Sequence, residues 1–122
     1  MDDMLFKGVT GKFRLIPNFA FAVGNNGKIV GLRTGKEKKP HINPKSGLAQ
    51  VMLHYDGKYK MCYVHRLVAE AWLPNPNNYP YITHINGINS DNRVENLRWI
   101  SVEEWKENKA KELKAIRNGK GK

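Results

Sequence analysis

Short apolar runs bounded by turn-forming residues dominate the first half of the chain. Residues 19–23 are apolar and lead into an Asn-Asn-Gly sequence at 25–27. Asn and Gly tolerate positive φ angles, so this sequence predicts a tight turn and a return strand at 28–32. We expect strand character to begin at Phe13, after a weakly structured lead-in over residues 1–12.

A second hairpin is predicted further along the chain. Its arms are residues 48–55 and 58–63, joined by Asp56-Gly57, a pair that also suits a tight turn. The residues between the two hairpins, 33–47, are polar, basic and interrupted by Gly and Pro. They predict a basic loop with a short strand near residues 41–42.

The hydrophobic period changes from that of strands to that of a helix at residue 64. Apolar residues then recur at helical spacing, at Val64, Leu67, Val68, Ala71 and Trp72. Prolines at positions 74, 76 and 80 end this helix and stiffen an extended connector. Beyond the connector, residues 81–85 and 97–100 read as short strands on either side of a polar turn at 86–92.

A final helix is predicted from Ser101 to about residue 117. Ser101 and Glu104 have the spacing of a capping box, in which the serine hydroxyl accepts hydrogen bonds from first-turn amides. Lysines recur along this helix and in the tail at 118–122, so the whole C-terminal segment is basic.

Composition narrows the range of partners. The 122 residues include 21 Lys and Arg against 11 Asp and Glu, a formal net charge of +10. This excess favours a polyanionic partner, and without a strongly amphipathic basic helix it indicates nucleic acid rather than a membrane. No apolar stretch reaches membrane-spanning length. The single cysteine, Cys62, excludes an internal disulfide and a multi-cysteine zinc site, and it fits a cytoplasmic location.

Ordered motifs in the second half resemble the HNH homing endonucleases of phages and mobile introns. Residues 64–101 read VHRLVAEAWLPNPNNYPYITHINGINSDNRVENLRWIS. In order, they are similar to the family's V-H-R-L-V-A helix, P-N-P connector, H-x-[DN]-G turn and N-R-x-E-N-L-x-W segment. Residues 16–36, IPNFAFAVGNNGKIVGLRTGK, resemble the small β-hairpin module found upstream of HNH in such enzymes. Several motifs in matching order are far more specific than any one of them.

This resemblance implies an α+β fold with a small N-terminal β-hairpin lobe, an HNH ββα-metal motif and a basic C-terminal helix. The implied units are a lead-in at 1–12, a β-rich module at 13–63, an HNH domain at 64–117 and a basic tail at 118–122. The resemblance also implies metal-dependent hydrolysis of DNA phosphodiesters in a phage-infected or mobile-element-bearing bacterial cell.

The resemblance places the chemistry at His84. In the family this histidine ends the first strand and deprotonates a water beside one divalent cation, Mg²⁺ or Mn²⁺. Asn96 matches the asparagine that helps to orient the histidine, and Asn92 and Arg93 match loop positions near the DNA backbone. His65 matches the first histidine of the family's helix and is expected to be a structural residue rather than a ligand.

Two positions depart from the family's pattern, and both are metal-ligand positions. The Asp or Asn that usually precedes the catalytic histidine is Thr83 here, and the ligand on the final helix is Trp105. A hydroxyl is a weak ligand for Mg²⁺ and an indole is none. The pattern therefore predicts weakened or lost cleavage, with no cofactor if cleavage is lost. Glu104 and Asn108 are the side chains that a shifted helix would bring toward the metal.

Two basic regions are predicted to contact DNA. They are rich in lysine, which contacts phosphates as a point charge and gives salt-sensitive binding. The first region comprises Arg33, Lys36, Lys38, Lys39 and Lys45, and the second comprises Lys106, Lys109 and Lys114 on the final helix. Arg14, Arg33 and Arg93 are the arginines expected to contact phosphates or bases directly.

Three classes of function remain open on the sequence alone. The first is an active nicking or homing endonuclease, and the second is a silent relative that binds DNA or RNA. The third is a phage regulatory protein that uses the same fold to bind a host protein or ribonucleoprotein. Cleavage distinguishes the first class, and a steep salt dependence of DNA binding distinguishes the second from the third.

Overall fold

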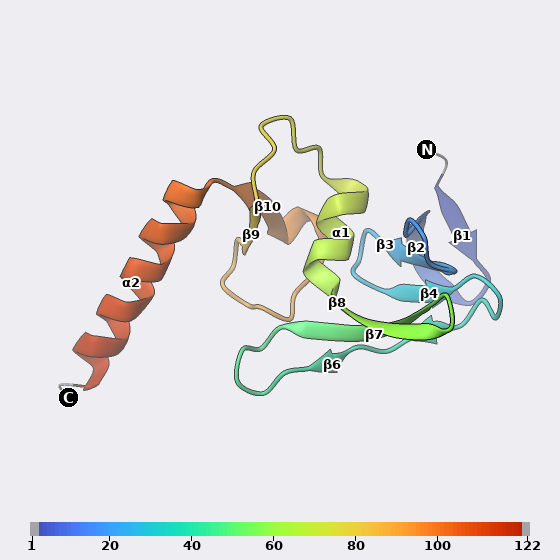
Figure 1. Cartoon of the computed structure of the whole chain (residues 1–122), viewed down its shortest axis with the longest axis horizontal. Helices are drawn as coiled ribbons and strands as arrows, with labels where there is room; N and C mark the ends of the chain where they lie inside the picture. Colours follow the sequence, from blue (N-terminus) through green and yellow to red (C-terminus); the bar gives the residue numbers. More distant parts are fainter. Residues whose placement is uncertain (1–2, 121–122) are drawn as a thin grey trace.

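The computed structural model describes residues 3–120, with side chains to residue 113, and has an α+β fold (Figure 1). The first sheet is antiparallel, and its five strands lie in chain order. They are β1 (Met4–Phe6), β2 (Val9–Leu15), β3 (Phe21–Gly24), β4 (Ile29–Gly31) and β5 (Glu37–Lys38). The tight turn predicted at 25–27 joins β3 to β4, with Gly27 at φ 85°.

The second sheet contains the other predicted hairpin. Its strands are β6 (His41–Ile42), β7 (Ala49–Tyr55) and β8 (Lys58–Tyr63), all antiparallel. Alternate residues of β7 point into the core, so Ala49, Val51 and Leu53 are buried while Met52 is exposed. Asp56 and Gly57 both take positive φ angles in the turn, as this pair predicts.

The helix α1 (Val64–Trp72) follows β8 with no intervening residue. Val64, Val68 and Ala69 are its buried residues, in line with the predicted apolar face. The helix ends where Leu73 N donates to Ala69 O at 3.0 Å and Pro74 follows, because proline has no amide hydrogen to continue the ladder.

A two-stranded antiparallel ribbon follows the proline-rich connector. It consists of β9 (Tyr81–His84) and β10 (Leu97–Ile100), with a 3₁₀ turn, η1 (Val94–Asn96), just before β10. The register pairs His84 with Leu97. The sequence thus correctly predicted that this histidine ends the first strand.

The final helix, α2 (Val102–Lys120), begins after Ser101. The hydroxyl Oγ of Ser101 accepts a hydrogen bond from the Glu104 amide at 3.2 Å, which is the serine half of the predicted capping box. The helix continues past its predicted end into the predicted tail, of which residues 121–122 lie outside the described residues. In Figure 1 it extends away from the body of the molecule. No helix within residues 3–120 is long and apolar enough to cross a bilayer.

One hydrophobic core connects the two halves of the chain. It joins buried residues of the first sheet (Val23, Ile29), the second sheet (Val51, Leu53), α1 (Val64, Val68) and β10 (Leu97). A smaller cluster around Phe13 occupies the other face of the first sheet. The predicted division into a β-rich module and an HNH domain stays a prediction, but the two segments are packed against each other through α1.

Two expectations about the first half were wrong in detail. Residues 1–12 are not weakly structured throughout, because β1 and most of β2 lie there; Phe6 and Phe13 pack edge to face at 5.4 Å. The basic loop at 33–47 contains the short strand predicted at residues 41–42, which is β6, and also β5, which was not predicted. These two short strands belong to different sheets.

Candidate active site

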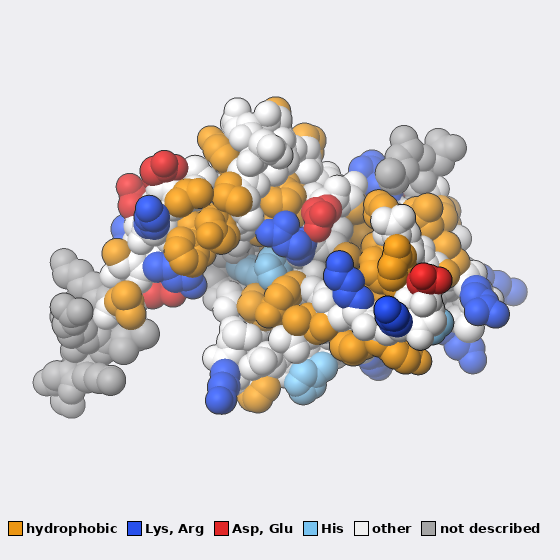
Figure 2. Space-filling model, in the orientation of Figure 1, with side chains coloured by type: hydrophobic (Ala, Val, Ile, Leu, Met, Phe, Trp, Pro, Cys, Tyr) orange, Lys and Arg blue, Asp and Glu red, His pale blue; other side chains and the backbone are white. Residues whose placement is uncertain are grey.

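His84 lies at the edge of a cleft of about 470 Å³. The histidine itself is only 9% exposed. The cleft lies between the β9–β10 ribbon, the start of α1, the loop before β7 and the first turns of α2. Its lining includes Ser46, His65, Arg66, Tyr81, Thr83, His84, Asn89, Trp105, Asn108, Lys109 and Glu112. In Figure 2 histidine side chains are visible in a hollow near the centre of the face.

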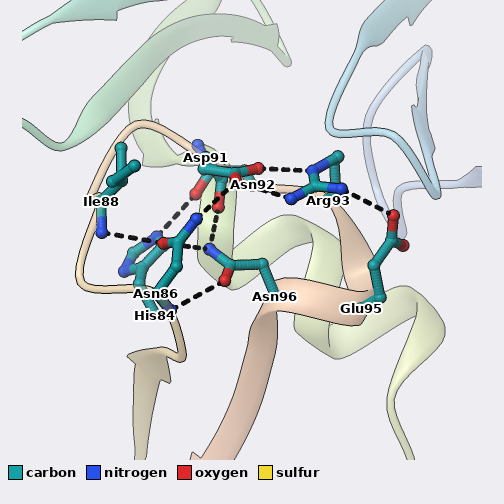
Figure 3. Close-up of polar contacts among 8 residues, drawn as sticks. All are labelled: His84, Asn86, Ile88, Asp91, Asn92, Arg93, Glu95 and Asn96. Carbon is teal, nitrogen blue, oxygen red and sulfur yellow. Dashed lines mark hydrogen bonds and ion pairs between the residues drawn. The ribbon is translucent and has the colours of Figure 1, made fainter.

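The ring of His84 is held by Asn92. His84 Nε2 and Asn92 Oδ1 are 2.8 Å apart, and both side chains are buried (Figure 3). An amide oxygen only accepts hydrogen bonds, so Nε2 donates and the neutral ring keeps its lone pair on Nδ1. In this tautomer Nδ1 is the nitrogen that could accept a proton, as a general base does.

Asn96 has a different part in the same loop. Its side-chain oxygen accepts from the Asn86 amide at 3.0 Å, and its Nδ2 donates to Asn86 Oδ1 and to the Asp91 carbonyl at 3.0 and 2.8 Å. Asn96 is 5% exposed and closes the 85–91 turn rather than bonding to the His84 ring. Sequence reasoning placed Asn96 on the histidine and Asn92 on the DNA backbone, whereas in the structure Asn92 is buried and bonded to the histidine.

The turn between β3 and β4 packs directly on Asn92. Asn25 O accepts a hydrogen bond from the Val94 amide at 2.9 Å. Gly27 faces Asn92 so closely that a Cβ at Gly27 would lie 3.0 Å from the Asn92 carbonyl oxygen. The N-terminal sheet therefore supports the residue that holds the histidine.

Arg93 is engaged by two carboxylates beside the same turn. Its guanidinium makes two 2.8 Å hydrogen bonds to Asp91 and a longer contact of 3.4 Å to Glu95. The hydrogen bonds from Arg93 hold the pKa of Asp91 well below its usual range, and those to Asp91 raise the pKa of Arg93. The arginine remains half exposed, so a contact from Arg93 to DNA stays a prediction that would compete with this ion pair.

The two positions at which the sequence resemblance implies metal ligands, Thr83 and Trp105, do not suit a hard cation. The indole of Trp105 stacks on the Tyr81 ring with centroids 4.6 Å apart and planes 13° apart. Thr83 contributes only a hydroxyl to the cleft. Among residues 3–113, no three His, Cys, Asp or Glu side chains form a group that could hold a metal ion. Mg²⁺ and Mn²⁺ prefer carboxylate oxygens, so the donor set at these positions does not fit the family's cation.

The two neighbouring side chains considered as replacements differ in their surroundings. Glu104 is bound to Arg98 through a two-pronged ion pair, which lowers the pKa of the carboxyl and keeps it outside the cleft lining. Asn108 does line the cleft. A single amide is a neutral ligand, so Asn108 alone does not restore a carboxylate site.

His65 lies beside His84, which sequence reasoning did not foresee. The two ring centroids are 5.2 Å apart with planes at 53°, and the Tyr63 and His65 ring centroids are 5.6 Å apart. The Nδ1 atom of His65 is shielded from solvent and has no hydrogen-bond partner within the described residues. Burial, together with the nearby His84 and Arg66, lowers the pKa of His65 from 6.5 to about 4.

The predicted basic residues divide between the cleft and the far end of the molecule. Lys109 lines the cleft, and Lys45 adjoins Ser46, whose carbonyl accepts from Asn89 at 2.8 Å. Arg33, Lys36 and Lys39 instead lie beside β4 and β5, and Lys38 is part of β5; in Figure 1, β4 lies on the side of the molecule away from α2. Lys106 is exposed on α2, and the side chain of Lys114 lies outside the described residues. Basic side chains in Figure 2 are spread over this face rather than gathered at one place.

Arg14 was predicted to contact phosphates or bases, but in the structure it packs within the fold. Its guanidinium lies 4.1 Å over the Trp72 ring and donates to Ala71 O at 3.0 Å and to Asp3 at 2.9 Å. These contacts join β2 to the end of α1. Arg66 was missed from sequence; it lines the cleft, donates to Pro80 O at 3.0 Å and lies 5.8 Å from the Trp99 ring.

Comparison with known proteins defines the class. Residues 62–105 match the family model described as HNH endonuclease. The fold resembles a solved structure of DNA binding and cleavage by the HNH homing endonuclease I-HmuI, with a TM-score of 0.70 and 27% identity. That match covers 87% of this chain and 67% of the other. Residues 62–105 thus match the HNH endonuclease family, and the fold of the chain is similar to that of an HNH homing endonuclease.

Curated relatives share part of their length with this chain. The DNA endonuclease I-HmuI of Bacillus phage SP01 is 33% identical over 66% of this chain and 46% of its own length. An uncharacterised HNH endonuclease of Acanthamoeba polyphaga mimivirus is 34% identical over 69% of this chain and 25% of its own length. The chain therefore spans less than half of the length of these two relatives. HNH endonucleases generally depend on a metal ion.

The lowered pKa of His65 predicts acid sensitivity. Between about pH 6.5 and pH 4 the unfolded chain binds a proton at His65 that the folded chain excludes, so the free energy of unfolding falls on acidification. From pH 7 to pH 5 the loss is roughly 2 kcal/mol. Urea unfolding at both pH values should show this loss in the wild type and a clearly smaller one in His65→Gln. An exposed-histidine control, His54→Gln, should behave like the wild type; equal losses in all three proteins would contradict the prediction.

The contact between Gly27 and Asn92 predicts an unusually costly alanine substitution. Gly27 and Gly57 both take positive φ angles, 85° and 76°, so alanine is strained at each by about 1 kcal/mol. Only at Gly27 would the new Cβ also meet the Asn92 carbonyl; nothing lies within 4 Å at Gly57. Gly27→Ala should therefore cost a further 1–2 kcal/mol or so in urea unfolding. It should also shift the His84 ring resonances in NMR spectra, and Gly57→Ala should not. If the two variants had the same stability and the same His84 resonances, support of Asn92 by the turn at Gly27 would be ruled out.

Proposed function

We propose that this chain is a DNA-binding HNH protein that keeps the general base of the family but has a degraded site for the hard cation. Its cleavage of phosphodiester bonds is therefore weak or lost. One contrast carries the proposal: Asn92 holds the His84 ring by its Nε2 and leaves Nδ1 for a proton, while Trp105 stacks on Tyr81 at a position where the family has a ligand.

The DNA-binding half of the proposal rests on charge and on the relatives. A chain with a net charge of +10 attracts a phosphate backbone, and Arg66 and Lys109 line the cleft beside His84. Related proteins include a homing endonuclease whose solved structure concerns DNA binding and cleavage. A DNA strand lying across the cleft would bring a phosphate within reach of both basic side chains and of the histidine.

The catalytic half of the proposal follows from the hydrogen bond that orients the His84 ring. With Nε2 bonded to Asn92, Nδ1 is free to take a proton from a water that attacks a phosphate. The cation, when bound in the family, neutralises the charge that develops on the phosphate oxygens. Thr83 and Trp105 supply neither a carboxylate nor an amide for that purpose, so the base remains and the Lewis acid is missing or weakly held.

DNA binding should depend on the lysines that border the cleft. Lys45→Gln with Lys109→Gln should weaken binding to duplex DNA about five- to tenfold and reduce the slope of log affinity against log salt by about 1 to 2. The matched control, Lys7→Gln with Lys12→Gln, removes the same charge from the β1–β2 region and should change both quantities less. Fluorescence anisotropy across a salt series measures them. Absence of binding at low salt, or equal effects of the two pairs, would refute this mode of binding.

Restoring ligand chemistry should restore cleavage. Thr83→Asp combined with Trp105→Asn returns oxygen donors to both positions, and we expect at least tenfold faster nicking of supercoiled plasmid with Mg²⁺ or Mn²⁺ than in the wild type. Adding His84→Ala should abolish the gain.

The control for restored cleavage is Thr83→Ser combined with Trp105→Phe, which changes the same positions without adding a good ligand. Melting temperatures accompany the assay, because losing the Tyr81 stack is expected to cost about 1 kcal/mol. Rapid wild-type cleavage that disappears in His84→Ala would show that the cation site is competent and would overturn the proposed loss.

A further inference from the structure

The geometry points to a second kind of metal site in the cleft, in which His65 and His84 together bind a transition-metal dication of the Zn²⁺ class. This inference goes beyond the proposed function, because it needs neither DNA nor cleavage. It differs from the family's oxygen-lined site in both its ligands and its metal.

The separation of the two rings is compatible with two ligands on one ion. A zinc–nitrogen bond of about 2.0–2.1 Å places an imidazole centroid about 3.2 Å from the metal, and two such rings at a tetrahedral angle are then about 5.2 Å apart. The His65 and His84 centroids are 5.2 Å apart, with planes tilted by 53°.

The hydrogen bond to Asn92 leaves one nitrogen of the His84 ring with a lone pair that a metal ion could bind. Asn92 occupies Nε2 of His84, so the lone pair of the neutral ring is on Nδ1. Metal-binding histidines usually have their other nitrogen fixed by such a partner, which sets the tautomer and the orientation of the ring. Asn92 therefore has the position of an outer partner of a metal ligand.

His65 would supply the second metal-binding nitrogen, Nδ1, which is also a buried polar atom without an assigned partner. Its Nδ1 is shielded from solvent and has no hydrogen-bond partner among the described residues, although buried polar atoms are nearly always paired. A metal ion is one partner that this nitrogen accepts. Burial also keeps the ring neutral at pH 7, since its pKa is about 4, and neutral imidazole is the form that binds metals.

The composition of the cleft selects the class of metal. Imidazole nitrogen is a good ligand for Zn²⁺, Co²⁺ and Ni²⁺ and a poor one for Mg²⁺. Asn89 and Asn108 line the same cleft, and water molecules would fill the positions on the ion that the two histidines leave open. A bound ion would take the lone pair of His84, so it would also prevent this residue from acting as a base.

Titration of the tag-free, chelator-treated full chain with Zn²⁺ and with Co²⁺ tests the site. We expect one equivalent to bind, with calorimetry for Zn²⁺ and tetrahedral d–d absorption bands for Co²⁺. Affinity should fall at least tenfold in His65→Gln and in His84→Gln. The matched controls His41→Gln and His54→Gln, which change exposed histidines, should bind like the wild type.

NMR of the wild-type protein keeps the test independent of how the variants fold. Co²⁺ should shift or broaden the ring resonances of His65 and His84 and leave those of His41 and His54 sharp. Absence of binding, or paramagnetic effects centred on Cys62 or on the exposed histidines, would overturn the inference. DNA binding measured without metal is unaffected by either result, so failure of this site and failure of the proposed function are distinguishable.

Discussion

The hydrogen bond of 2.8 Å between His84 and Asn92 determines what the cleft can do chemically. Both groups are buried, and leaving either one unpaired would cost on the order of 1–3 kcal/mol, so the ring has one strongly favoured orientation. The bond also decides which nitrogen is free, and base catalysis and metal ligation both depend on that choice. Asn92 is in turn fixed from the N-terminal side of the chain, through the packing of Gly27 and the hydrogen bond from Val94 to Asn25. The first sheet is therefore part of the site's construction.

Features governed by short-range rules were predictable from the sequence. The Asn-Asn-Gly turn at 25–27, the start of α1 at Val64 and the serine cap at Ser101 all appear where local patterns place them. The position of His84 at the end of β9 was also predicted, because a motif of fixed spacing puts a histidine at the end of a strand. Such features involve residues close in sequence, and their geometry is set by backbone preferences that hold in any protein.

Features that depend on distant contacts were not predictable in the same way. Asn92 and Asn96 lie in one polar loop, and only its folded path decides that Asn92 bonds to His84 while Asn96 closes the turn. The neighbouring position of His65 arises from the packing of α1 against the β9–β10 ribbon, which no local pattern records. Arg14 looked like a DNA contact because its charge is visible in the sequence, whereas its place over the end of α1 is not.

The direct passage from β8 into α1 has a consequence for how this protein tolerates change in length. Tyr63 ends the strand and Val64 begins the helix, so no flexible residue separates them. A single residue inserted at this junction would rotate the helix by about 100°. A single residue inserted within β8 would move its side chains to the opposite face of the sheet. Either event would carry His65 away from His84 while leaving every residue of the cleft present. The junction therefore fixes the position of His65 relative to His84, and insertions are better tolerated in the loops on either side.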